Sequence, residues 1–423
     1  MIRITTSFSK LTGCLIVMLF LAGCVKDKCT HTYTYFMPVY KTTADVRANI
    51  KSNQPHQIER PGKLFIKGDY IFLNEIDKGI HIINNSNPAS PKNVAFIDIP
   101  GNMDLAVKGN ILYADLYTDL VTLDITNPMQ VIVKSIIDNA FPERSYSGGF
   151  RPDNSKIIVN WVQRDTTVTI QCNGRGRMNV AIDCPTCMFL DMASSSWSGQ
   201  KSSSPYGMGG SMARFTIVNS YLYTVSNTSL DVYNISVPQT PAFTSKVQLG
   251  WGIETIYPFK DKLFIGSNTG MFIYDISNPI QPSKQGQFNH VRTCDPVIAE
   301  DNYAYVTLRT GTGCPGSTNQ LDILDITNVS QPLPMKSYPM TNPHGLSKDG
   351  DLLFICDGTD GLKVYNAANR NSISLVKHIS GFKTYDVIAW NDVAIVSAAD
   401  GLYQYDYSNV DDIKLLSKTV WKK

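Results

Sequence analysis

The segment Leu120-Val-Thr-Leu-Asp-Ile-Thr-Asn-Pro128 decides the fold of this 423-residue chain. It joins a run of β-forming apolar residues to an Asp and an Asn-Pro pair, which predicts a short strand that ends in a tight turn. The Asp side chain can accept hydrogen bonds from backbone N–H groups of that turn. Pro then ends the strand, because it has no N–H to donate to a neighbouring strand.

The same phrase recurs along the chain, with close copies at Met271-Phe-Ile-Tyr-Asp-Ile-Ser-Asn-Pro279 and Leu321-Asp-Ile-Leu-Asp-Ile-Thr-Asn-Val329. The key Asp or Asn of each copy stands at Asn84, Asp124, Asp191, Asn234, Asp275, Asp325, Asn366 and Asp406. Five of the seven steps between these positions are 40 to 43 residues long, and the other two require insertions. A β-rich hairpin pattern precedes each copy and a further β-rich run follows it. Four short strands in about 41 residues are typical of one β-propeller blade.

This spacing predicts an all-β fold, a β-propeller of about eight four-stranded blades. The alternative is seven blades with residues 140–210 as one large insertion, because the copy at Asp191 is weak. Eight blades are favoured because Asp191 and Asn234 are one normal step apart. We expect the β-rich residues 32–40 to join the last blade and close the ring. Residues 194–210 are rich in Ser and Gly and indicate a linker.

The N-terminus has the pattern of an export signal over residues 1–23. Arg3 and Lys10 precede an uncharged, mostly apolar run that is too short to span a membrane. The run ends in Leu21-Ala22-Gly23-Cys24, which resembles a bacterial lipobox. We therefore expect cleavage before Cys24 and lipidation of its thiol, with palmitate among the acyl chains, so that the membrane is a partner through the anchor.

The anchor also predicts where the protein resides. Val25, rather than Asp, follows the lipidated Cys, and this resembles the sorting pattern that favours the outer membrane. We expect a lipoprotein of the cell envelope that faces the periplasm or is exposed at the cell surface. The predicted division of the mature chain is a lipidated tether and extension over residues 24–59 and a single propeller domain over residues 60–423.

The repeated phrase resembles the LVIVD repeat, which is found in secreted and lipid-anchored bacterial β-propeller proteins. The resemblance covers roughly residues 60–420, although the copies at Asn366 and Asp406 lack the Pro. It implies a propeller fold and an envelope location. It implies no particular activity, because the family is defined by its repeat.

One face of the propeller is expected to carry the binding site. Strands a to d run from the central channel outward, and the d–a links and b–c loops share one face. Insertions in the third blade (residues 163–185) and the sixth (residues 310–319) are both expected in b–c loops, so they enlarge that face. A polar residue near the start of most inner strands, with an aromatic residue nearby, defines a candidate binding mouth: Lys63, Asp104, Arg151, Arg214, Glu254, Trp251, Asp295, His344 and Asp386. Such a mouth suits a small ligand or a glycan; the alternative is that its charges only solvate a water-filled channel.

The cysteines outside the signal and the anchor are expected in an oxidising compartment. Cys172 could pair with Cys184 across a hairpin, and Cys294 could pair with Cys314 beside the other insertion; the connectivity cannot be deduced from sequence. Cys356 lies in an apolar run, which predicts a buried free thiol.

Catalytic and metal-binding motifs are absent from the sequence. The six His stand singly, and no HExxH, GxSxG, P-loop or EF-hand pattern occurs. The repeated Asp residues could suggest calcium, but their recurrence once per blade favours turn capping. We therefore predict no metal site and no cofactor.

The function predicted from these observations is a non-catalytic binding or assembly platform for an envelope protein or a glycan. The alternative is a glycan-acting lyase or hydrolase that uses carboxylates at the mouth, so the enzyme question stays open. Lys and Arg total 38 against 36 Asp and Glu, and this near-neutral balance argues against nucleic acid as a partner. A hydrophobic content of 43% allows a large core.

Overall fold

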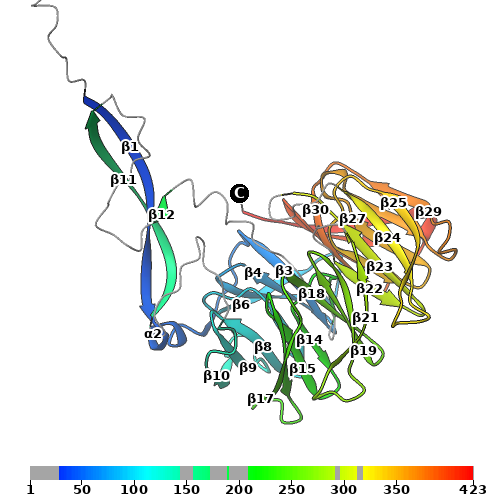
Figure 1. The fold of residues 1–423 in the computed structure, drawn as a ribbon, viewed down its shortest axis with the longest axis horizontal. Coiled ribbons are helices and arrows are strands. Elements are labelled where there is room, and N and C mark those ends of the chain that lie inside the picture. Colours follow the sequence, from blue (N-terminus) through cyan, green and yellow to red (C-terminus); the bar gives the residue numbers. More distant parts are fainter. Residues whose placement is uncertain are drawn as a thin grey trace, which may run out of the picture. The chain divides into compact units, whose positions relative to one another are not determined.

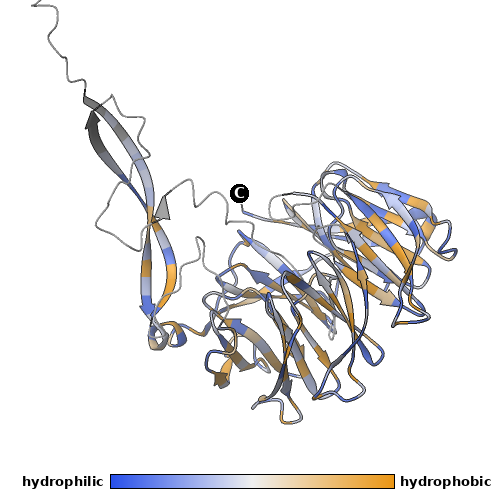
Figure 2. Ribbon diagram, viewed as in Figure 1, coloured by the Kyte–Doolittle hydropathy of each residue, from blue (hydrophilic) through white to orange (hydrophobic). Residues whose placement is uncertain are grey.

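The structure, a computed structural model of the chain, describes residues 28–142, 156–171, 188–189, 208–290, 296–311 and 318–422. The described strands form a seven-bladed β-propeller and one separate three-stranded sheet (Figure 1). Each blade pairs four antiparallel strands in the order a-b-c-d, and the inner strands contact one another around a closed ring. Figure 2 shows the apolar residues concentrated in the strands of the blades and hydrophilic residues in the connecting turns.

The blades follow one another along the chain. Blade 1 contains β3 (Pro61–Lys67), β4 (Tyr70–Glu75), β5 (Gly79–Asn84) and β6 (Lys92–Asp98), and blade 2 contains β7 (Leu105–Lys108), β8 (Ile111–Leu116), β9 (Asp119–Asp124) and β10 (Ile132–Ile137). Blade 3 contains β14 (Phe215–Val218), β15 (Tyr221–Val225), β16 (Ser229–Asn234) and β17 (Ala242–Gln248), and blade 4 contains β18 (Ile253–Phe259), β19 (Lys262–Ser267), β20 (Gly270–Asp275) and β21 (Ser283–Asn289). Blade 5 contains β22 (Val297–Glu300), β23 (Tyr303–Leu308), β24 (Gln320–Asp325) and β25 (Leu333–Pro339), and blade 6 contains β26 (Leu346–Asp349), β27 (Leu352–Cys356), the 3-10 turn η2 (Gly358–Asp360), β28 (Leu362–Asn366) and β29 (Ser374–Ile379). Blade 7 contains β30 (Thr384–Trp390), β31 (Val393–Ala398), β32 (Gly401–Asp406), the 3-10 turn η3 (Val410–Asp412) and β33 (Lys414–Val420).

The expectation of eight blades is therefore wrong, and the seven-blade alternative is confirmed. Blade 2 ends at Ile137 and blade 3 begins at Phe215, and the described residues between them form no blade. The key position Asp191 lies outside the described residues. The first insertion thus occupies the link from strand d of blade 2 to strand a of blade 3, rather than a b–c loop. The second insertion, at residues 310–319, does lie in a b–c loop, that of blade 5.

The separate sheet is built from two distant parts of the chain. Its order is β11 (Lys156–Gln171), β1 (Lys28–Thr42) and β12 (Met188–Phe189). Thr34 donates a hydrogen bond of 2.7 Å to Asp165, and Tyr35 pairs with Phe189. The expectation that residues 32–40 close the propeller ring is therefore wrong, because β1 takes its partners from the insertion. The chain forms two compact units: one comprises residues 1–39 and 160–196, and the other comprises residues 40–159 and 197–423.

The ring closes where blade 7 meets blade 1. Trp421 and Ile58 are buried with apolar side chains of both blades, and the Lys422 backbone N–H donates to the Ile58 carbonyl at 2.7 Å. Asn85 and Gln404 exchange two amide hydrogen bonds of 2.9 and 2.6 Å across the same seam. A short helix, α2 (Thr43–Arg47), and β2 (Lys51–Asn53) lead into the ring, and β2 extends the outer edge of blade 1. Apolar packing and hydrogen bonds therefore both seal the boundary between blades 7 and 1.

The turn after strand c is the same in every blade. The side-chain oxygen of the key residue accepts a hydrogen bond of 2.7–3.0 Å from the backbone N–H two residues later, at Asn84, Asp124, Asn234, Asp275, Asp325, Asn366 and Asp406. The predicted turn-capping role is confirmed at these seven positions. A register shift follows in each c–d pairing, and such bulges twist an outer strand away from edge-to-edge association.

Candidate functional site

The candidate mouth lies at the inner ends of the blades, but its charged side chains are largely withdrawn from solvent. Lys63, Asp104, Glu254 and Asp386 are buried at the starts of four inner strands. Arg214 and His344 are partly buried. Arg151 and Asp295 lie outside the described residues. The described residues of the predicted mouth therefore lie at the inner ends of the blades, and the sequence did not show what covers them.

A short segment at residues 208–214, which we call the plug, lies across the channel. Its strand β13 (Met208–Gly209) pairs with the innermost strand of blade 1, β3, on the side facing the channel. Ser211 Oγ then accepts a 2.8 Å hydrogen bond from the backbone N–H of Leu346 in blade 6. The carbonyl of Ala213 accepts a 2.7 Å bond from the Ile256 N–H in blade 4. The plug thus ties together inner strands from opposite parts of the ring.

Small residues let the plug fit. A Cβ atom added at Gly210 would lie 2.0 Å from Oδ2 of Asp386, and one added at Gly345 would lie 2.0 Å from Oδ1 of the same carboxylate. Ser211, Met212 and Ala213 are all buried. The expectation of a Ser/Gly linker over residues 194–210 therefore fails at its end: Gly210 is small because it packs against a blade. The run of small residues was the only sequence signal for this close packing, and in the sequence it favoured a linker instead.

The plug also completes a buried cluster of charges. Asp104 Oδ2 accepts a 2.7 Å hydrogen bond from the Lys63 ammonium and a 2.8 Å bond from the Arg214 backbone N–H. Burial lowers the pKa of Lys63, while the negative charge of Asp104 opposes that shift. Burial likewise lowers the pKa of the Arg214 guanidinium, against the attraction of Glu254 and then of Asp104. These charges neutralise one another inside the ring.

The opposite side of the channel is also internally bonded. The Gly345 N–H donates to the Tyr385 carbonyl at 2.9 Å, and His344 packs edge-on against the Tyr385 ring at 5.7 Å between centroids. The His344 ring nitrogen Nε2 lies 2.9 Å from Oδ1 of Asn342. The mouth residues on this side thus have structural partners within blades 6 and 7.

Trp251 is the exception among the described mouth residues, because 69% of its surface is exposed. It lies in the link from β17 to β18, on the face that the d–a links share. Gly250 and Gly252 flank it with φ angles of 119° and 80°, values that side-chain-bearing residues rarely adopt. The backbone of this link is therefore shaped by two glycines around a solvent-facing indole.

A cleft of about 320 Å³ was not expected from the sequence. Val46 and Lys51 line it on one side, and Asp77, Asp98 and Tyr117 line it on the other. Burial raises the pKa of the Asp98 carboxyl. The cleft joins the segment before the propeller to blades 1 and 2, a pairing that no local sequence pattern reveals.

Cys356 is a buried free thiol, as predicted, and burial raises its pKa well above the ordinary value. Cys24, the predicted lipidation site, and the four candidate disulfide residues lie outside the described residues: Cys172, Cys184, Cys294 and Cys314. No helix in the described part of the chain is long and apolar enough to cross a membrane.

Comparison with known sequences identifies the repeat on these blades. The LVIVD repeat family matches residues 62–97, 101–139, 262–290 and 292–340. The chain carries LVIVD repeats. The matched segments cover blades 1 and 2, three strands of blade 4 and all of blade 5. The remaining blades share the strand order and the turn cap of these LVIVD repeats.

Comparison with solved structures agrees with the propeller fold. The computationally designed Ika8 protein is similar over 88% of this chain and 89% of its own, at 9% identity and a TM-score of 0.51. A protein from Lactobacillus plantarum is similar over 83% of this chain and 96% of its own, at 12% identity and a TM-score of 0.50. At such low identity these similarities show the fold alone. No curated protein matches the sequence.

Proposed function

We propose that this protein is a lipid-anchored, non-catalytic binding or assembly platform of the bacterial cell envelope, and that Trp251 contacts its protein or glycan partner. The observation that carries this proposal is the contrast at the mouth. The charged residues there are buried against one another and against the plug, whereas 69% of Trp251 is exposed.

An exposed indole on a glycine-flanked link suits recognition better than catalysis. Covering apolar surface contributes roughly 25 cal/mol per Å², and a Trp offers about 150–250 Å². Trp is also enriched among the residues that dominate binding energy at interfaces. The same flat ring can pack against the face of a sugar or against an apolar patch of a protein. A partner that covers Trp251 would therefore gain a few kcal/mol at this one position.

The proposed anchor supports the envelope location. Cys24 follows the apolar export pattern, and strand β1 begins at Lys28, only a few residues later. The lipidated end would therefore lead directly into the separate sheet. Metabolic labelling with a palmitate analogue should mark the wild type and leave Cys24→Ala unlabelled. Label retained in Cys24→Ala would contradict the anchor.

The binding role is tested with full-length protein immobilised in detergent. It is incubated with a bacterial envelope extract and, separately, with a panel of cell-wall and surface glycans. Trp251→Ala should reduce the amount of bound partner at least tenfold, which corresponds to about 1.4 kcal/mol. The matched control is Val237→Ala, which removes a 58%-exposed apolar side chain from the c–d turn of blade 3, on the opposite face.

Two outcomes would contradict the proposal. Equal capture by the wild type, Trp251→Ala and Val237→Ala would show that the partner does not use Trp251. Conversion of any glycan in the panel to shorter products by the wild type would show catalysis, and it would favour the enzyme alternative instead.

A further inference from the structure

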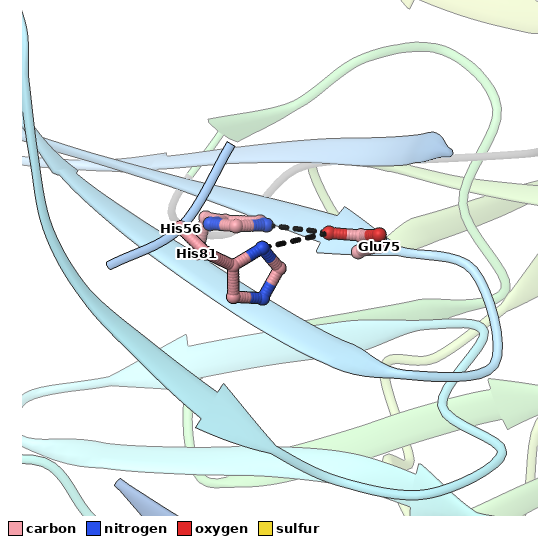
Figure 3. A group of neighbouring side chains, drawn as sticks. All are labelled: His56, Glu75 and His81. Carbon is pink, nitrogen blue, oxygen red and sulfur yellow. Dashed lines mark hydrogen bonds and ion pairs between the residues drawn. The ribbon is translucent and has the colours of Figure 1, made fainter. Parts of the chain in front are cut away.

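Three side chains with metal-binding atoms converge on blade 1. His56 comes from the segment before β3, Glu75 ends β4, and His81 lies in β5 (Figure 3). One ligand atom from each lies within 4.8 Å of the others. His81 Nε2 is 2.7 Å from Oε2 of Glu75, and His56 Nδ1 is 4.0 Å from the same oxygen. The two imidazoles thus face a single carboxylate oxygen.

The surroundings of this cluster are enclosed on all but one side. Glu75 and His81 have no exposed side-chain surface, whereas 42% of the His56 side chain is exposed. Phe96 packs against both imidazoles, with ring centroids 4.4 and 4.6 Å away. The exposed edge of His56 provides an entry path and room for a water ligand.

The outer contacts orient the carboxylate. Lys78 donates a 2.7 Å hydrogen bond to Oε1 of Glu75, and Glu59 in turn accepts a 2.7 Å bond from Lys78. The charge of Lys78 is therefore shared between two carboxylates. Oε1 is occupied, and Oε2 is left pointing at the two imidazoles.

Asn93 supplies a second and independent observation. Its amide nitrogen lies 3.0 Å from Nδ1 of His81 and donates a 3.0 Å bond to the His56 carbonyl, while its oxygen Oδ1 is buried without a hydrogen-bond partner. A cation on Nε2 of His81 requires the ring proton to sit on Nδ1. A half-turn of the Asn93 amide would then let the partnerless oxygen accept that proton, as the outer partners of metal-bound histidines do.

We propose that His56, Glu75 and His81 form a binding site for a divalent transition metal of the zinc class, with water as the remaining ligand. Two imidazoles and one carboxylate with an open position form a donor set that suits Zn²⁺. On binding, the Nε2 proton of His81 and the Nδ1 proton that His56 donates to the Gln57 carbonyl both leave to water. The other nitrogen of each ring takes one proton up, so both imidazoles stay neutral. The ion replaces the 2.7 Å hydrogen bond between His81 and Glu75.

Such an ion would also fasten the ring. The segment that carries His56 continues to Ile58 and Glu59, which bind the backbone and the ammonium of Lys422 at the C-terminal end of blade 7. Fixing His56 to blade 1 therefore also fixes Ile58 and Glu59, to which Lys422 is bonded. Metal binding should raise the thermal midpoint of the protein.

The test is a calorimetric titration of the metal-free, full-length protein in detergent with Zn²⁺. Accessible thiols are first alkylated, so that cysteines cannot supply the ligands. We expect one saturable equivalent in the wild type and at least tenfold weaker binding in His56→Ala, whose partly exposed side chain can be removed without opening the core. The matched control is His378→Ala, which removes a histidine paired with Asp360 on blade 6 and should bind like the wild type.

A conservative variant sharpens the test. Asn93→Asp places a carboxylate beside Nδ1 of His81, and this should tighten Zn²⁺ binding severalfold because a carboxylate accepts that proton more strongly than an amide. The proposal is overturned if the alkylated wild type shows no saturable equivalent. It is also overturned if His56→Ala binds as tightly as the wild type, or if Asn93→Asp weakens binding.

Discussion

The turn between strands c and d is built the same way in all seven blades, whereas the inner end of strand a differs from blade to blade. Every c–d turn uses one Asp or Asn oxygen to accept one backbone N–H. The inner ends carry Lys63, Asp104, Arg214, Glu254 and Asp386, which pair with each other or pack on the plug. The repeated end fixes the shape of a blade locally. The non-repeated end depends on contacts that only the closed ring provides.

This difference predicts that the inner ends are the more sensitive to substitution. A turn cap is in most blades only partly buried, and water can replace its one hydrogen bond when it is lost. A buried charge at the channel has no such substitute.

The largest effect is expected for Lys63→Met, which leaves the Asp104 carboxylate buried without its ammonium partner 2.7 Å away. Breaking a buried ion pair costs about 3–5 kcal/mol of unfolding free energy. Lys63→Met with Asp104→Asn should recover part of that loss, because the uncompensated charge is gone. Urea unfolding measures the free energy of unfolding of the single and the double variant.

The control for this prediction is Lys67→Met on the same strand, where the lysine is partly exposed. It should change the unfolding free energy by no more than about 0.5 kcal/mol. Equal losses for Lys63→Met and Lys67→Met would mean that the inner end is no more demanding than the surface.

The next largest effect is expected for Gly210→Ala, because the new Cβ would lie 2.0 Å from the Asp386 carboxylate. Overpacking of this kind costs about 1–3 kcal/mol. The same substitution in an Asp386→Ala background should cost less, since the clashing oxygens are absent. Identical costs in the two backgrounds would show that the plug does not press against blade 7.

A smaller effect is expected when acid protonates the capping carboxylates of the c–d turns and so lowers the stability of the fold. The hydrogen bonds from Thr126 hold the pKa of Asp124 at about 2, and the bonds from Lys262 and then Ser277 hold that of Asp275 at about 2. The unfolded-state pKa of Asp is near 3.9. Because the folded values are lower, these carboxylates contribute stability that is complete above about pH 4 and lost as the pH falls toward 2.

Replacing both capping Asp residues by Asn tests whether their protonation lowers the stability of the fold as the pH falls. Asn serves as the cap at Asn84, Asn234 and Asn366, so the turn should persist without the charge. The Asp124→Asn, Asp275→Asn variant should lose less stability than the wild type between about pH 5 and pH 3, as measured by urea midpoints. Parallel losses in the two proteins would show that these caps do not titrate with folding.

The smallest effect on stability is expected for Trp251→Ala. Because 69% of Trp251 is exposed, its removal should change the unfolding free energy by no more than about 0.5 kcal/mol. A large loss of stability in thermal unfolding would mean that Trp251 supports the fold. Reduced partner capture by this variant would then reflect unfolding rather than the loss of a contact with the partner.

The same contrast explains what the sequence could predict. Structure that depends on neighbouring residues can be predicted from a sequence. The strand, the Asp or Asn cap and the spacing of the blades therefore followed from a few residues such as Asp124 and Asp275. The count failed at Asp191, because a similar phrase happened to stand one normal step before Asn234. Strand β11 follows blade 2 in the sequence but pairs with β1, more than a hundred residues earlier, and no local pattern encodes that pairing.

At the candidate site the sequence predicted which residues gather, but it did not predict what they contact. Lys63, Asp104 and Arg214 do meet at the inner ends of their blades. Their mutual neutralisation depends on the plug, whose Gly210 and Ser211 resemble linker residues until their neighbours are known. His56, Glu75 and His81 were likewise separate singletons in the sequence. Only the strand register of blade 1 and the position of the segment before β3 bring them together.

Hydrogen exchange of the plug amides tests the central claim most directly. The account holds that residues 208–214 close the channel and are part of the folded ring, with Ser211, Met212 and Ala213 buried and the Arg214 N–H donating to Asp104. Mass spectrometry of peptides covering this segment should therefore show protection comparable to that of the inner strands β18 and β26. Exchange as fast as that of the exposed link around Trp251 would contradict the account, because it would mean that the channel is open.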